Sequence, residues 1–305
     1  MKRIFFFTAI IAFVFILCSC EREGVYAPEK RIASISINNE IGLIEKEEWI
    51  WEKDLLAGIN IDGNDGSIRC HYNGKQLTSV EAHGQLFFFT YDKHGRKLLS
   101  MEGFRNVFDA QQGRSMVQMD FTYNEAGQIS GFEGKEYWNI INDDAKAKIN
   151  MQSTIRRLFP FLPDISSVSN SKDSKRTYDR ITAIFNYKDG NMTDGTYTHY
   201  GVDTCYFQYT YTDYPNPYFK CFARNTRFNP FLFNRHILSI NLPKECLVTH
   251  HTFFSDYPIY YEKVSYSYEM DKDGYPIVEK LNYKMYVDDV YESNSIRIDQ
   301  IEYLP

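Results

Sequence analysis

The chain has 305 residues, of which 16% are aromatic and 24% are charged, and its formal net charge at pH 7 is −6. This acidic balance, with no basic run in the body of the chain, argues against nucleic-acid binding and against a polybasic membrane patch. The 24 Tyr and 23 Phe residues favour strands, so the composition predicts a mainly β protein.

The N-terminus predicts a secretory signal peptide over residues 1–19. Lys2 and Arg3 precede an apolar run over residues 4–17. As a helix this run spans roughly 21 Å at 1.5 Å per residue, whereas a bilayer core is about 30 Å thick. A cleaved signal therefore fits better than the alternative, an uncleaved N-terminal membrane anchor.

The signal ends in a sequence like a bacterial lipobox, Leu17-Cys18-Ser19-Cys20, which predicts lipidation of Cys20. More than one acyl chain on this cysteine makes a stable membrane anchor. Residues 20–29 then form a tether. We expect a lipid-anchored protein of the cell envelope at the outer membrane, periplasmic or surface-exposed, with the membrane as a partner through the anchor.

A loose repeat predicts β-hairpins along the rest of the chain. Each copy carries Tyr, a few polar residues and Gly between two alternating segments. Alternating aromatics place one row of side chains on a buried face, and Asn-Gly or Asp-Gly steps supply the positive φ of a tight reversal. We predict an all-β fold, an antiparallel hairpin meander curled into a barrel-like or strongly bent sheet. The copies are residues 72–77, 89–98, 121–129, 185–190 and 266–275.

One short helix near residues 143–159 interrupts this pattern. Asn142–Asp144 is a capping cluster with acids suited to a helix N-terminus. Apolar residues follow at helical spacing, and Pro160 stops the helix.

The helix and a polar loop join two β-rich halves, about 30–140 and 177–305. Each half alone has few strands. We therefore predict one domain over residues 30–305, with the helix packed over an opening, rather than two small domains.

Four cysteines remain in the mature chain besides Cys20, and an exported protein can pair them in three ways. Their spacings match no small disulfide scaffold, so free buried thiols are favoured. If a bridge forms, Cys205–Cys221 is the expected pair, because both lie on neighbouring strand-like runs.

Motifs spread over most of the mature chain point to one family. They are the lipobox, Tyr26–Pro28 with Lys30–Ile32, Trp49 with Trp51, the Tyr–Gly hairpins, Tyr211–Pro217 and Tyr268–Pro276. Together they resemble an uncharacterised family of Bacteroidetes-type lipoproteins with a β-rich domain of unknown function and a porin-like fold. The resemblance implies a fold and a location. It implies no activity and transfers no catalytic residue.

No common catalytic or cofactor motif occurs in the mature chain. We predict no catalytic residue, no cofactor and no metal. His250 and His251 are adjacent on a strand and point to opposite faces, so they cannot ligate one metal there. The turns that begin at Asp62 and Asp271 lack the Glu that a calcium loop carries at its twelfth position, and tight reversals explain both.

The aromatic surplus is the one indication of function. Exposed flat rings on a rigid β scaffold suit sugar faces and apolar peptide segments. Trp49 and Trp51 share one strand face, which favours the core. The candidate ligand-binding aromatics near turns are Tyr214, Tyr218, Tyr257 and Tyr260.

We therefore predict a lipid-anchored envelope protein with a non-enzymatic binding or structural role, whose partner is a glycan, a peptide or an envelope protein. One alternative is a glycan-acting hydrolase with a carboxylate pair that meets only in the fold. Another is an accessory subunit of an outer-membrane uptake system. The acidic runs at 45–48 and 288–289 are expected to face water.

Overall fold

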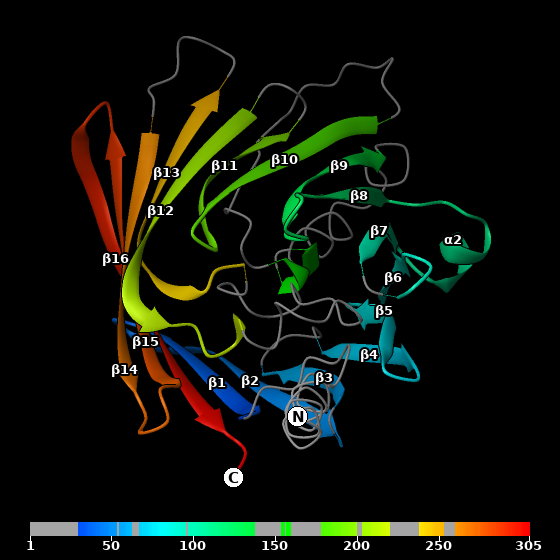
Figure 1. Cartoon of the computed structure of the whole chain (residues 1–305), viewed down its shortest axis with the longest axis horizontal. Helices are drawn as coiled ribbons and strands as arrows, with labels where there is room; N and C mark the ends of the chain where they lie inside the picture. The colour runs from blue at the N-terminus through cyan, green and yellow to red at the C-terminus, as the bar shows by residue number, and fades with distance from the viewer. Residues whose placement is uncertain are drawn as a thin grey trace, which may run out of the picture.

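Sixteen antiparallel strands close into one barrel in the computed structural model of the protein (Figure 1). The predicted all-β class is confirmed. The structure describes residues 30–53, 55–62, 67–95, 97–137, 154–155, 157–159, 178–199, 203–219, 238–252 and 260–305. The predicted signal peptide and tether, with Cys20, lie outside these residues.

Each strand pairs with its neighbours in sequence, and β16 pairs with β1 to close the barrel. Strand β9 of the first half pairs with β10 of the second half, so one sheet contains both. The strands are β1 Ile32–Asn39, β2 Gly42–Glu52, β3 Leu55–Ile61, β4 Ile68–Asn73, β5 Gln76–Ala82, β6 Gln85–Tyr91, β7 Leu98–Phe104, β8 Val117–Tyr123, β9 Ile129–Tyr137, β10 Tyr178–Lys188, β11 Asn191–His199, β12 Asp203–Pro215, β13 Asn241–Thr252, β14 Tyr260–Met270, β15 Pro276–Val287 and β16 Val290–Tyr303.

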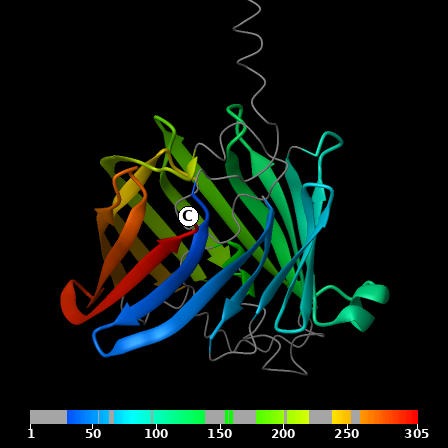
Figure 2. The same ribbon diagram turned by 90° about the horizontal axis from the view of Figure 1, so that it is seen from below.

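The antiparallel order gives the barrel two distinct ends. The chain enters β1 and leaves β16 at one end, called here the entry end, and turns that follow odd-numbered strands lie at the other, the far end. The short helix α2, Val107–Gln111, projects from the far end between β7 and β8 (Figure 2). Its N-cap is Asn106, whose side chain accepts from the backbone N–H of Asp109. The sequence analysis did not predict this helix.

The strands bury their inner faces, while their outer faces carry polar side chains together with some exposed apolar ones such as Ile184. On β10, Asp179, Ile181, Ala183 and Phe185 are buried, and the residues between them are more exposed. Alternation of this kind is what a period of two residues produces in a strand. The hydrophobic core is therefore the barrel interior, lined by Phe, Met, Ile and Leu from most strands.

Tyrosines near the entry end, most of them in the predicted repeat, hydrogen-bond neighbouring strands. Each hydroxyl donates to the backbone carbonyl of one of the first three residues of the preceding strand, as Tyr187 does to Ile129 at 2.8 Å. Trp51 makes the equivalent contact on β2 with Ile32 at 2.7 Å. We call these residues the aromatic girdle. The other donor–acceptor pairs are Tyr72–Leu56, Tyr123–Leu98, Tyr211–Met192, Tyr268–Pro243 and Tyr303–Pro276.

All five predicted hairpins occur, and their turns lie together at the entry end. The part of the predicted helix that the structure describes is helical at 154–155 and 157–158, and residues 143–153 lie outside the described residues. Within the described part of the chain, no helix is long and apolar enough to cross a membrane.

Candidate functional site

The predicted ligand-binding aromatics do not form one surface. Tyr214, 52% exposed, lies near the entry end of β12. Tyr260, at the first residue of β14, lies at the far end and stacks on His250 with ring centroids 4.3 Å apart. Tyr257 lies outside the described residues. These positions separate Tyr214 from Tyr260 by the length of the barrel.

Tyr218 is a core residue, only 4% exposed. Its ring packs edge-on against Tyr275 with centroids 5.9 Å apart, and its hydroxyl hydrogen-bonds the hydroxyl of Tyr303. An extended ligand on the surface cannot stack on this ring. Trp49 and Trp51 stack on each other inside the barrel with centroids 6.4 Å apart, as expected for core residues.

The cysteine thiols that the structure describes are free: Cys70, Cys205 and Cys246. Cys205 and Cys246 are buried, and burial raises the pKa of each to about 12. A free Cys205 does not support the expected bridge with Cys221, which lies outside the described residues.

The histidine pair points to opposite faces. His250 is buried inside the barrel, while His251 is exposed outside and meets the Tyr206 ring edge-on at 5.3 Å. The described residues contain no group of three or more His, Cys, Asp or Glu side chains that could hold a metal ion.

The Asp271 turn is stabilised by the protein itself. Its Oδ1 accepts from the backbone N–H of Asp273 at 2.8 Å and of Tyr275 at 3.0 Å, which forms an Asx turn. Its Oδ2 pairs with the Lys30 ammonium, which also contacts Asp273 at 2.6 Å. The turn therefore fixes the chain just before β1.

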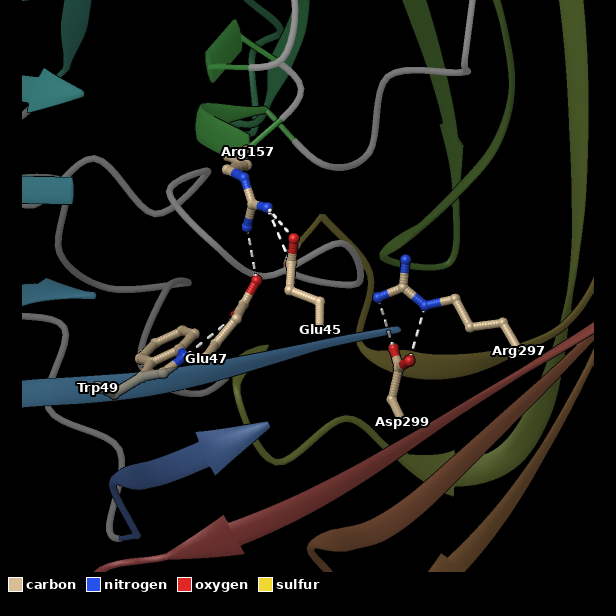
Figure 3. Close-up of polar contacts among 6 residues, drawn as sticks. All are labelled: Glu45, Glu47, Trp49, Arg157, Arg297 and Asp299. Carbon is tan, nitrogen blue, oxygen red and sulfur yellow. Dashed lines mark hydrogen bonds and ion pairs between the residues drawn. The ribbon is translucent and has the colours of Figure 1, made fainter. Parts of the chain in front are cut away.

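An ion-pair cluster inside the barrel is the main polar feature that the sequence analysis missed (Figure 3). Arg157, on the short helical segment, donates to Glu47 Oε1 at 2.7 Å and to both Glu45 oxygens at 2.9 Å. Trp49 Nε1 donates to the other Glu47 oxygen at 3.3 Å. The expectation that Glu45 and Glu47 face water was wrong, because both lie on the inner face of β2.

Burial opposes the charge on Arg157, but Glu47 and Glu45 outweigh it, so the pKa of the guanidinium is raised. The same segment places Phe159, which is fully buried, against Phe121 of β8 at 5.6 Å. Strands β2 and β8 are six positions apart in the barrel. Residues 157–159 therefore bridge two separate parts of the inner wall.

A second charged group lines the same side of the interior. Arg297 binds Asp299 through two hydrogen bonds, at 2.7 and 2.9 Å (Figure 3). Asp299 is 3% exposed and lies directly opposite Glu279 of β15, itself 6% exposed. Cross-strand neighbours have Cβ atoms about 4.5–5.5 Å apart, so two buried acidic side chains start from adjacent positions on the inner wall.

The sequence only partly indicates which residues form these two charged clusters. Glu45, Glu47 and Trp49 alternate along one strand, which places them on one face. Arg157 is about 110 residues away, and no local pattern links it to that strand.

Comparisons with protein-family models and with curated proteins gave no match. Among solved structures, a porin-like protein from Bacteroides uniformis matches with a TM-score of 0.51 at 9% identity, covering 90% of this chain and 98% of the other. A porin-like protein from Bacteroides vulgatus matches with a TM-score of 0.40 at 9% identity, covering 90% and 99%. The first of these likenesses shows that the chain has the fold of a porin-like β-barrel, which the resemblance of its motifs predicted.

Proposed function

We propose that the protein is a lipid-anchored cell-envelope protein whose barrel stands in water and acts by binding rather than by catalysis. The observation that carries this proposal is the polarity of the outer face. A barrel that spans a bilayer presents an apolar band about 25 Å tall to lipid. Here charged side chains point outward from within seven of the strands, β2, β4, β8, β9, β10, β14 and β15: Lys46, Glu48, Arg69, Asp120, Glu133, Lys135, Arg180, Lys263, Lys280 and Lys284.

The interior also differs from that of a water-filled channel. Its lining is largely apolar, with a fully buried Phe87, Phe132 and Phe207. Residues 157–159 bridge it from β2 to β8. These features support a packed barrel that offers surfaces for binding.

The position of Lys30 supports attachment of the barrel to the membrane through its entry end. It lies ten positions after Cys20, and an extended chain spans at most about 3.3–3.6 Å per residue. An acyl anchor on Cys20 therefore holds the entry end within roughly 35 Å of the membrane.

Metabolic labelling with a radioactive fatty acid tests the anchor. We expect the full chain to incorporate label in a bacterial host and Cys20→Ala to abolish the incorporation. Cys18→Ala is the matched control and stays labelled, because that residue leaves with the signal peptide. Label that persists in Cys20→Ala contradicts the proposal. A membrane-impermeant biotinylation reagent on intact cells then separates surface exposure from a periplasmic location.

The second candidate function is a glycan hydrolase, which the Glu279–Asp299 pair favours. Retaining glycosidases hold two carboxyl groups about 5–5.5 Å apart. Against this role, Asp299 is engaged at both oxygens by Arg297. Release of reducing sugar from a polysaccharide, lost in Glu279→Gln and retained in Asp120→Asn, would favour the enzyme; no release by the unmodified chain contradicts it.

A further inference from the structure

Strands β12 to β16 lie side by side on one side of the barrel (Figure 1). A row of tyrosines crosses the outer face of these strands. In the strand register Tyr206 lies opposite Thr249, which lies opposite Tyr261. Tyr261 lies opposite Tyr286, which lies opposite Tyr291. These positions are up to 85 residues apart in the chain. We call the four tyrosines the tyrosine row.

Three of the four rings contact one another, and the two rings at the ends of the row are exposed. Tyr261 and Tyr286 stack with centroids 4.8 Å apart and planes at 12°, and Tyr291 meets Tyr286 edge-on at 5.9 Å. Tyr206 is 47% exposed and Tyr291 is 53% exposed. The short side chain of Thr249 separates the Tyr206 and Tyr261 rings by two strand spacings, roughly 10 Å.

The row is long and has hydrogen-bonding neighbours. Five strands at about 4.8 Å spacing extend over roughly 19 Å. Burial and the neighbouring carboxylate of Asp289 raise the pKa of the Tyr261 hydroxyl. Exposed polar side chains adjoin the row. Some are positively charged, some negatively charged and some neutral, and they include Gln208, His251, Lys284, Glu292 and Asn294.

We propose that the tyrosine row binds an extended, uncharged polysaccharide chain. The apolar C–H faces of sugar rings pack on aromatic side chains, and their hydroxyls hydrogen-bond the phenols and the polar neighbours. This inference deepens the proposed binding function, because it assigns the ligand class and the site.

The surroundings of the row favour a sugar over an apolar peptide. A peptide that docks through apolar side chains needs aliphatic pockets, whereas the neighbours named above are polar. The mixture of Lys, Glu and Asp gives no dominant sign of charge, which favours an uncharged ligand over a charged one.

Affinity electrophoresis of the full chain in detergent, in gels that contain dextran, xylan, mannan or starch, tests the site. We expect at least one polysaccharide to retard the protein. The double variant Tyr206→Ala/Tyr286→Ala should bind it about tenfold more weakly, as truncation of anchoring aromatics does at interfaces. Tyr206→Trp keeps a ring at the same place and should retain binding.

Tyr178→Ala is the matched control, since Tyr178 is 41% exposed on the outer face of β10 and outside the row. It should bind as the unmodified chain does. If the double variant binds as strongly as the unmodified chain and its melting temperature is unchanged, the tyrosine row is not the binding site. Absence of retardation in all four gels contradicts an uncharged polysaccharide as the ligand. Fatty-acid labelling at Cys20 tests the envelope role separately. Self-association that the double variant abolishes, in place of retardation, would assign the row to a second copy and also overturn the proposal.

Discussion

The hydroxyl of Tyr123 donates a hydrogen bond at 2.9 Å to the carbonyl oxygen of Leu98, the residue at which the adjacent strand β7 begins. The same relationship recurs around the barrel in the aromatic girdle. Tyr91 occupies the equivalent position on β6, but its buried hydroxyl has no hydrogen-bond partner. The girdle therefore joins the beginning of one strand to the end of the next. Tyr91 is the exception, because it occupies the same kind of position without this hydrogen bond.

Tyr123→Phe should destabilise the barrel by about 1 kcal/mol, because a buried hydrogen bond to a backbone carbonyl is lost while the ring remains. Tyr91→Phe is the control and should leave the free energy of unfolding unchanged or slightly increase it, since no hydrogen bond is lost. Urea denaturation of both variants measures this. Equal effects of the two substitutions would show that the hydroxyl bond at Tyr123 contributes nothing.

The periodicity of the sequence predicted the all-β meander because a strand's pattern is local. Tyr123 and Gly127 alone identify one hairpin, since the ring faces inward and Gly127 takes the positive φ of the turn. The closure between β1 and β16 depends on pairing of residues far apart in the chain, such as Ile35 with Ile301. No local pattern encodes this pairing or the number of strands.

Residues that come together only through the pairing of strands were harder to predict from the sequence. Tyr261 and Tyr286 each follow the simple alternation of their strands, and their stacking depends on the register of β14 against β15. Tyr214 and Tyr218 both lie near turns, a local feature that does not distinguish an exposed ring from a buried one.

Arg157→Met should destabilise the protein by about 1–3 kcal/mol, because it leaves Glu45 and Glu47 without their counter-charge in a partly buried site. The control is Arg180→Met, which removes an ion pair with Glu133 whose side chains are both 65% exposed. That loss should cost less than about 1 kcal/mol. Thermal denaturation at low and high salt checks both; a larger effect at Arg180 would contradict the structural role of the interior cluster.

The contact between Lys30 and Asp271 should make stability depend on pH at both extremes. The hydrogen bonds to Asp271 and Asp273 raise the pKa of Lys30 above 10.5, so its contribution is lost as the pH rises through that raised value. Burial opposes ionisation of Asp271, but Lys30 and two backbone N–H groups outweigh it and lower its pKa below 3.8. Its contribution is therefore present at neutral pH and lost as the pH falls through the lowered value.

Asp271→Asn keeps the Asx turn and removes the charge, so it should lower the melting temperature at neutral pH. The difference from the unmodified chain should shrink as the pH falls below 3.8 and vanish below the lowered pKa of Asp271. Asp213→Asn, an exposed acid at the same end of the barrel, should show no such difference. A melting-temperature difference for Asp271→Asn that persists at the acid extreme would show that the charge is not its cause.

The buried thiols should resist alkylation in the folded protein. Burial raises the pKa of Cys205 and of Cys246 to about 12, so the reactive thiolate is scarce at neutral pH, and the reagent must also reach the barrel interior. Iodoacetamide should leave both unmodified until denaturant unfolds the chain, and peptide mass spectrometry without reductant measures this. A Cys205–Cys221 cross-linked peptide in that experiment would contradict the free thiol at Cys205. Rapid alkylation of Cys246 under native conditions would show that the interior near β13 opens to solvent, because a closed, packed wall excludes the reagent.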